Sequence, residues 1–109
     1  MSEKDLEKID NWIAQAVKEI MLSEPGTDRS QFPLRDILSS IAEKSSAVAG
    51  MEEFHKAAAF SANYIEEILF SGECYTAAQL DQLSSLATQL SDLRNDPSAQ
   101  FLPPEIPTS

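Results

Sequence analysis

The chain contains one histidine, His55, and its imidazole is the side chain best suited to acid–base, metal-binding or phosphoryl chemistry. Glu52 lies three residues earlier, so on a helix the two side chains share a face. Glu-x-x-His pairs serve as ligands in the dinuclear metal centres of helical bundles, which need a second such pair and two further glutamates. Because one chain supplies half of that set, only a dimer could complete it. We therefore expect no metal and no other cofactor, and interpret His55 first as a surface or boundary histidine.

Other catalytic patterns are missing from the sequence. The three glycines are widely separated and form no phosphate-binding loop. A Ser-His-Asp relay requires a base beside its nucleophile, and the single histidine is accompanied by no such motif. Cys74 has Glu73 beside it, which opposes thiolate formation, and no second cysteine to resolve an oxidised form. We expect Cys74 to be a small, partly buried side chain, and we expect the chain not to be an enzyme.

Four segments carry apolar residues at the three- and four-residue spacing of an amphipathic helix. The expected helices cover residues 4–22, 33–50, 51–70 and 76–94. Ser2 and Asp5 are a plausible capping pair at the start of the first helix. Four amphipathic helices with mostly short connections bury their apolar stripes most simply by packing side by side. The sequence therefore predicts an all-α fold, an antiparallel four-helix bundle.

Proline, glycine and threonine mark the expected ends of these helices. A loop is expected from Ser23 to Phe32, and Pro33 suits the first position of the second helix, where its missing N–H costs nothing. Gly50 is the expected end of that helix. Thr76, followed three residues later by Gln79, predicts a capping box at the start of the last helix.

The C-terminal residues differ in composition from the rest of the chain. Residues 95–109 contain four of the six prolines, a density that precludes a helix. We expect residues 1–94 to form the bundle and residues 95–109 to form an extended or disordered tail, which could be a linker.

Charge and length exclude several classes of partner. The chain has 109 residues with 8 Lys and Arg against 18 Asp and Glu, which gives a net charge of −10. This charge repels phosphates, so we expect neither nucleic acid nor an anionic membrane surface as a partner. No signal peptide or membrane-spanning run is recognisable, and one cysteine cannot form an internal disulfide. The expected location is the cytoplasm.

The order of several short motifs resembles a known family. Residues 50–54 read Gly-Met-Glu-Glu-Phe, residues 65–69 read Ile-Glu-Glu-Ile-Leu, and residues 72–73 form a Gly-Glu turn before the Thr-capped last helix. Over residues 33–93 this order is similar to the histidine phosphotransfer domain, in particular the N-terminal domain of chemotaxis-type histidine kinases. The resemblance implies a four-helix bundle that exchanges phosphoryl groups with, or docks, a receiver or kinase domain.

The sequence departs from that family at the position of the phosphoacceptor. Counting back from Gly50, the acceptor histidine falls at or near Ser40, and the His-x-x-Lys-Gly signature is absent. Lys44 is displaced by one position from the family's lysine. A serine hydroxyl needs activation and forms a stable ester, so it cannot replace the imidazole in a relay. The resemblance therefore implies a degenerate member without chemistry, whose docking surface on the second and third helices includes Ser40, Glu43, Lys44 and His55.

Two other functions remain open from the sequence. His55 could itself be a relocated phosphoacceptor, because Ala58 and Ala59 are small and leave its ring accessible on a helix. Alternatively, the chain is a structural or oligomerisation domain tethered by its tail, and its state, monomer or homodimer, is left undecided. Trp12 either packs at the edge of the first apolar stripe or serves as an exposed docking aromatic.

Overall fold

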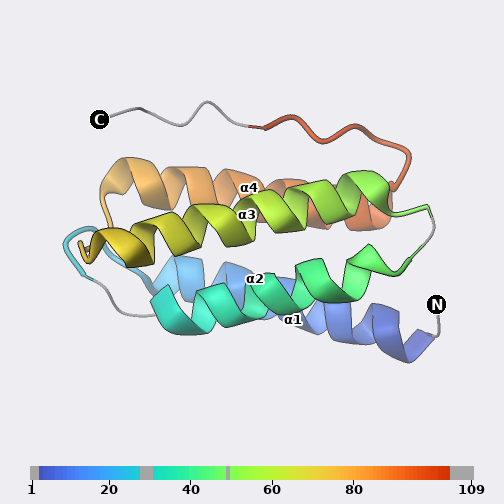
Figure 1. Cartoon of the computed structure of the whole chain (residues 1–109), viewed down its shortest axis with the longest axis horizontal. Helices are drawn as coiled ribbons and strands as arrows, with labels where there is room; N and C mark the ends of the chain where they lie inside the picture. Colours follow the sequence, from blue (N-terminus) through green and yellow to red (C-terminus); the bar gives the residue numbers. More distant parts are fainter. Residues whose placement is uncertain (1–2, 28–30, 49, 104–109) are drawn as a thin grey trace.

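The computed structural model of the chain describes residues 3–27, 31–48 and 50–103. They form four helices, α1 (Glu3–Leu22), α2 (Gln31–Ser46), α3 (Glu52–Ser71) and α4 (Ala77–Asn95). Each helix runs antiparallel to the one before it, and α4 packs against α1 to close the bundle (Figure 1). The radius of gyration is 13.3 Å. The predicted all-α bundle is confirmed.

The core is built from the apolar stripes of the four helices, which meet along the bundle axis. Burying each large aliphatic side chain contributes about 1.5–3 kcal/mol. The fully buried aliphatic and aromatic residues that fill the centre are Ile9, Leu34, Ile41, Phe54, Ile65, Leu83, Leu86 and Leu90. None of the helices in the described part of the chain is long and apolar enough to cross a membrane.

Helix α2 begins two residues before the predicted position, because Gln31 and Phe32 are helical. Gln31 is buried, and its Nε2 donates to the carbonyl oxygen of Glu73 at 3.1 Å, which fixes the first turn against the loop after α3. Pro33 fits inside this turn because the first N–H groups of any helix lack an intrahelical partner. This long-range contact is not visible in local spacing.

The same helix ends at Ser46, four residues before Gly50, so the predicted end was wrong. The Ser46 hydroxyl donates to the carbonyl oxygen of Glu43 at 2.7 Å, and the Ser45 hydroxyl donates to that of Ala42 at 3.2 Å. Serine side chains that bond nearby backbone compete with continued helix. Two adjacent serines thus end α2 before the glycine is reached.

The predicted signals at α4 and at the end of α3 are confirmed. Thr76 Oγ1 accepts from the Gln79 N–H at 3.1 Å, and Gln79 Oε1 accepts from the Thr76 N–H at 2.9 Å, which completes the capping box. Gly72 adopts a left-handed conformation with φ of 70° after α3, as a C-terminal glycine cap requires. Of the pair expected at the first helix, Ser2 lies outside the described residues.

The α1–α2 and α3–α4 loops are joined at one end of the bundle. The Gly26 N–H donates to the Tyr75 carbonyl at 2.8 Å, and the Tyr75 N–H donates to the Thr27 carbonyl at 2.7 Å. Tyr75 points inward and is 2% exposed. Its neighbour Cys74 is exposed, so the expectation of a partly buried cysteine was wrong. Successive residues of an extended segment face opposite sides, and Tyr75 takes the inner one.

Candidate functional site

Three of the four predicted site residues lie on one face of α2. Ser40, Glu43 and Lys44 are spaced by three and four residues and turn toward α1. Together with Trp12 and Ala47 they line an open hollow of about 300 Å³. The hollow therefore combines a hydroxyl, a carboxylate, an ammonium group and an indole.

One of the lining residues, Lys44, forms an ion pair with α1. Lys44 Nζ lies 2.9 Å from Asp5 Oδ1, and the two side chains are about a third exposed, at 36% and 32%. The pair joins the C-terminal half of α2 to the first turns of α1. Asp5 was expected as a capping residue, and no local pattern pointed to its contact with Lys44.

Trp12 is the aromatic side of the hollow. It is half-buried and packs against the core cluster while lining the same depression as Ser40. The predicted packing of Trp12 at the edge of the first apolar stripe is confirmed, and its role as a docking aromatic stays a prediction. Its membership of the site could not be deduced from spacing, since it comes from a different helix.

His55 lies on the opposite side of α2, in the first turn of α3. It is half-buried, and its Nδ1 is 2.9 Å from the carbonyl oxygen of Ala42 and 3.3 Å from Ser45 Oγ. A carbonyl oxygen can only accept, so the proton of the neutral ring is on Nδ1. The lone pair of that ring is then on Nε2, which has no hydrogen-bond partner among the residues the structure describes.

A second hollow, of about 360 Å³, surrounds this histidine. Lys56 carries a raised pKa, chiefly because it hydrogen-bonds Glu53, with its Nζ 2.8 Å from Glu53 Oε2. In the described part of the chain, no three or more His, Cys, Asp or Glu side chains are arranged to hold a metal ion. The residues that line this second hollow are Ser45, Ser46, Ala47, Val48, Glu52, His55 and Lys56.

The four predicted residues thus do not share one surface. Ser40, Glu43 and Lys44 belong to the hollow between α1 and α2, whereas His55 belongs to the hollow at the α2–α3 connection. Only Ala47 lines both. The two groups are apart because they lie on different sides of α2. His55 contacts residues 42 and 45, which point in another direction around the helix than residues 40 and 44.

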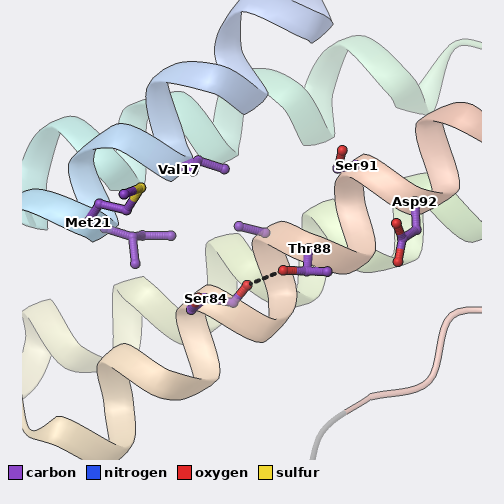
Figure 2. Close-up of a pocket in the computed structure, with 8 residues that line it drawn as sticks. Val17, Met21, Ser84, Thr88, Ser91 and Asp92 are labelled. Atoms are coloured by element: carbon purple, nitrogen blue, oxygen red, sulfur yellow. Dashed lines mark hydrogen bonds between the residues drawn. The ribbon is translucent and has the colours of Figure 1, made fainter.

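A third hollow, which the sequence did not indicate, lies between α1 and α4. Figure 2 shows Val17 and Met21 of α1 facing Ser84 and Thr88 of α4 across it. Its volume is about 250 Å³, and the Thr88 hydroxyl is committed to the Ser84 carbonyl at 3.0 Å. The lining consists of apolar and hydroxyl side chains with one carboxylate, that of Asp92.

Comparison of the chain with family models, with curated proteins and with solved structures finds no match. Function is therefore inferred from the residues and their geometry. In the second hollow the Ser45 hydroxyl lies 3.3 Å from His55 Nδ1, but that nitrogen carries the ring proton toward the Ala42 carbonyl, so it is not a base for the serine in this arrangement.

Proposed function

We propose that the chain is a non-catalytic cytoplasmic docking module of a two-component or chemotaxis-type pathway, related in design to histidine phosphotransfer domains, that binds a receiver or kinase domain. The observation that carries the proposal is the hollow at Trp12, Ser40 and Lys44. It lies at the helix position where the resemblance expects the acceptor. It offers the indole of Trp12, a residue type enriched among those that dominate protein interfaces, and beside it the Lys44 ammonium group, which is paired with Asp5.

We propose a docking function without phosphoryl transfer because of the residues that line that hollow. The residue at the acceptor position is Ser40, and the chain's imidazole is on the other side of α2. A serine hydroxyl requires a base to attack phosphorus, and its phosphate ester is too stable to be passed on. A partner domain can still dock on such a surface without transfer.

The test is a binding titration. The ¹⁵N-labelled chain is titrated with receiver and kinase domains from the source organism, and shifted amide signals are mapped. Trp12→Ala and Lys44→Glu should each weaken binding by about tenfold or more, as expected for central interface residues. Asp81→Ala, an exposed change on α4, is the matched control and should bind normally.

Circular dichroism of each variant confirms that the helices are retained. If folded Trp12→Ala and Lys44→Glu bind the partner as well as the unchanged chain does, this hollow is not the docking surface. A chain that binds none of the receiver or kinase domains contradicts the proposal as a whole.

A second candidate function is phosphotransfer through His55, and one contact favours it. With Nδ1 donating to the Ala42 carbonyl, the Nε2 lone pair is the nucleophile available in an open hollow. Attack on a receiver's aspartyl phosphate would form an N–P bond and break the P–O bond, with the aspartate carboxylate as leaving group. No helper base is needed for this step, because the attacking nitrogen carries no proton.

Incubation with a phosphorylated receiver domain, followed by mass spectrometry, distinguishes the two candidates. An acid-labile phosphate on His55 that is lost in His55→Gln would replace the non-catalytic reading by the second candidate. A chain that binds the receiver domain but stays unphosphorylated supports docking alone. Ser45→Ala serves as the control, since it keeps the Ala42 contact of the ring.

A further inference from the structure

The described residues after α4, 96–103, form a strap that returns along the bundle over α3 and α4 (Figure 1). The segment is non-helical after a turn in which the Ala99 N–H donates to the Asp96 carbonyl at 3.1 Å. Phe101 is its anchor, 7% exposed, with its ring centroid 5.7 Å from that of Phe60 in an edge-to-face arrangement of 62°. An aromatic side chain of the strap therefore packs against α3 and belongs to the hydrophobic core.

Side chains of the bundle also hold the main chain of the strap. Gln89 Nε2 donates to the Leu102 carbonyl at 2.8 Å, while Gln89 Oε1 accepts from the Leu102 N–H at 3.1 Å. This one amide satisfies both main-chain groups of a residue, as a neighbouring β-strand would. Leu102 is 68% exposed. Gln89 therefore binds the main chain of this residue, and the contact does not depend on the identity of its side chain.

A carboxylate supplies the third main-chain contact. Glu53 Oε1 accepts from the Phe101 N–H at 3.3 Å, and Glu53 Oε2 lies 2.8 Å from Lys56 Nζ. The pKa of Glu53 is lowered, first by its hydrogen bond to Lys56 and also by the Phe101 N–H. The group is therefore an ionised acceptor fixed in place by a neighbouring cation.

The strap is attached at few points. Of its residues, Ala99 and Phe101 turn inward, and the remaining ones of segment 96–103 are exposed. Pro97 lies in the Asp96–Ala99 turn and Pro103 follows the anchor, and each proline ring fixes its own φ, which lowers the entropy cost of ordering the segment. The strap thus has the features of a docked peptide, with one aromatic anchor and a row of main-chain hydrogen bonds.

We propose that the groove formed by Glu53, Phe60 and Gln89 is a binding site for an extended peptide segment with a phenylalanine anchor, and that residues 99–102 occupy it in cis. A partner that carries a segment of the same chemistry displaces the strap. The groove lies on the α3–α4 side of the bundle, away from the hollow at Trp12 and Ser40, and it borders the second hollow through the ion pair of Glu53 with Lys56. Its occupation by a tethered ligand makes the apparent affinity for a partner depend on release of the strap.

The test uses the full chain and a fluorescent synthetic peptide with the sequence of residues 96–103. Phe101→Ala releases the strap, so fluorescence anisotropy should show peptide binding at least about tenfold tighter than that of the unchanged chain. Adding Gln89→Ala should reduce this binding by about tenfold, because two main-chain contacts are lost. Thr88→Ala, one residue away and facing the hollow between α1 and α4, is the matched control and should leave binding unchanged. A peptide in which alanine replaces phenylalanine should not bind.

Equal binding by the unchanged chain and Phe101→Ala would show that the strap does not occupy the groove. A helical Phe101→Ala variant that binds no peptide overturns the site. Sedimentation of the unchanged chain at the same concentration tests whether the strap of one copy binds the groove of another. A dimer that dissociates on Phe101→Ala would show that the occupant of the groove is a second copy, and would overturn the proposal of a different partner.

If Phe101→Ala unfolds, the amide hydrogen exchange of the unchanged chain tests the proposal in its place. The amides of Phe101 and Leu102 should be protected, yet exchange at least about a hundredfold faster than the central amides of α3, through local opening. Exchange only through global unfolding would mean that the strap is a permanent part of the core. No protection at all would mean that the groove is empty, and either result rejects the proposal.

Discussion

The Nδ1 atom of His55 and the carbonyl oxygen of Ala42 are 2.9 Å apart, and this contact joins the first turn of α3 to the C-terminal part of α2. The Ser45 hydroxyl donates to the same carbonyl at 3.2 Å, so one oxygen receives two donors, one from α2 itself and one from α3. The contact has a chemical and a structural consequence, because it selects the tautomer of the ring and it pins the helix ends together.

The tautomer can be observed directly. We expect long-range ¹⁵N–¹H spectra of the neutral ring to show the proton on Nδ1 and a lone pair on Nε2. Ser45→Ala should leave this pattern unchanged, because the Ala42 carbonyl remains the acceptor. A ring protonated on Nε2 would contradict the assignment and would remove the support for phosphotransfer through that nitrogen.

The structural role of His55 predicts a loss of stability. His55→Ala should lower the free energy of unfolding by about 1–2 kcal/mol, because a half-buried hydrogen bond and its packing are lost. Lys56→Ala, at the next position, should change it much less, since the Lys56 side chain is 65% exposed and surface ion pairs contribute little. Urea unfolding of both variants measures the difference, and equal effects would show that the Ala42 contact contributes nothing.

Tyr75 predicts a loss of stability at alkaline pH. The pKa of its phenol is raised to about 12, chiefly by burial. The nearby Ser23 hydroxyl lowers this pKa in part, and the negative charge of Glu19 raises it further. A phenol is neutral when protonated, so the folded chain retains this proton at pH values where the unfolded chain has lost it. Stability from this group is therefore complete below pH 10 and falls between pH 10 and about 12.

The measurement is urea unfolding across that range for the unchanged chain and Tyr75→Phe. The Tyr75 hydroxyl is buried and makes no hydrogen bond of ordinary geometry with the residues described. Removing it should cost nothing at neutral pH and add up to about 1 kcal/mol of stability, because an unsatisfied polar group is lost. The variant should also show a weaker decline above pH 10, and an identical decline would assign the alkaline effect to other groups.

The capping box at α4 predicts a smaller, local effect. Thr76→Ala removes the acceptor of the Gln79 N–H and should cost about 1 kcal/mol of unfolding free energy. Thr88→Ala is the matched control inside the same helix, where alanine is tolerated and the expected change is within about 0.5 kcal/mol. Thermal unfolding by circular dichroism compares the two, and an equal loss would mean that the cap is not a specific contribution.

Local sequence was sufficient for the helices and insufficient for the contacts between them. The stripes of apolar residues and the Thr76–Gln79 cap are periodic or short-range features, so they predicted four helices and the start of α4. The start of α2 depends on the bond from Gln31 to Glu73, residues that are 42 positions apart, and no local pattern contains it.

The candidate site shows the same division. Ser40, Glu43 and Lys44 were placed together correctly because helical spacing determines their shared face. Trp12 and Asp5 reach that hollow from α1, and His55 is separated from it by the width of α2. Which residues of two helices become neighbours depends on how the packed helices are rotated relative to each other. That rotation is set by the interlocking of their side chains, which the spacing along one helix does not contain.

Two ion pairs attach α1 to its neighbours, and their geometry predicts unequal contributions. Arg94 Nη2 donates to Asp10 Oδ2 at 3.3 Å, and Arg94 Nε lies 2.9 Å from Oδ1 without hydrogen-bond geometry, so the guanidinium lies against both carboxylate oxygens. Lys44 makes one contact with Asp5, at 2.9 Å. A planar guanidinium loses less freedom for each contact than an ammonium group does.

Replacing each cation by methionine keeps the aliphatic stem and removes the charge. Arg94→Met should lower the unfolding free energy by about 1 kcal/mol and Lys44→Met by less than about 0.5 kcal/mol, because partly exposed single contacts are weak. In 1 M salt the Debye length falls to about 3 Å, so most of the loss in Arg94→Met should disappear if it is electrostatic. A loss that persists unchanged in salt would instead show that Arg94 acts through the packing of its side chain between α4 and α1.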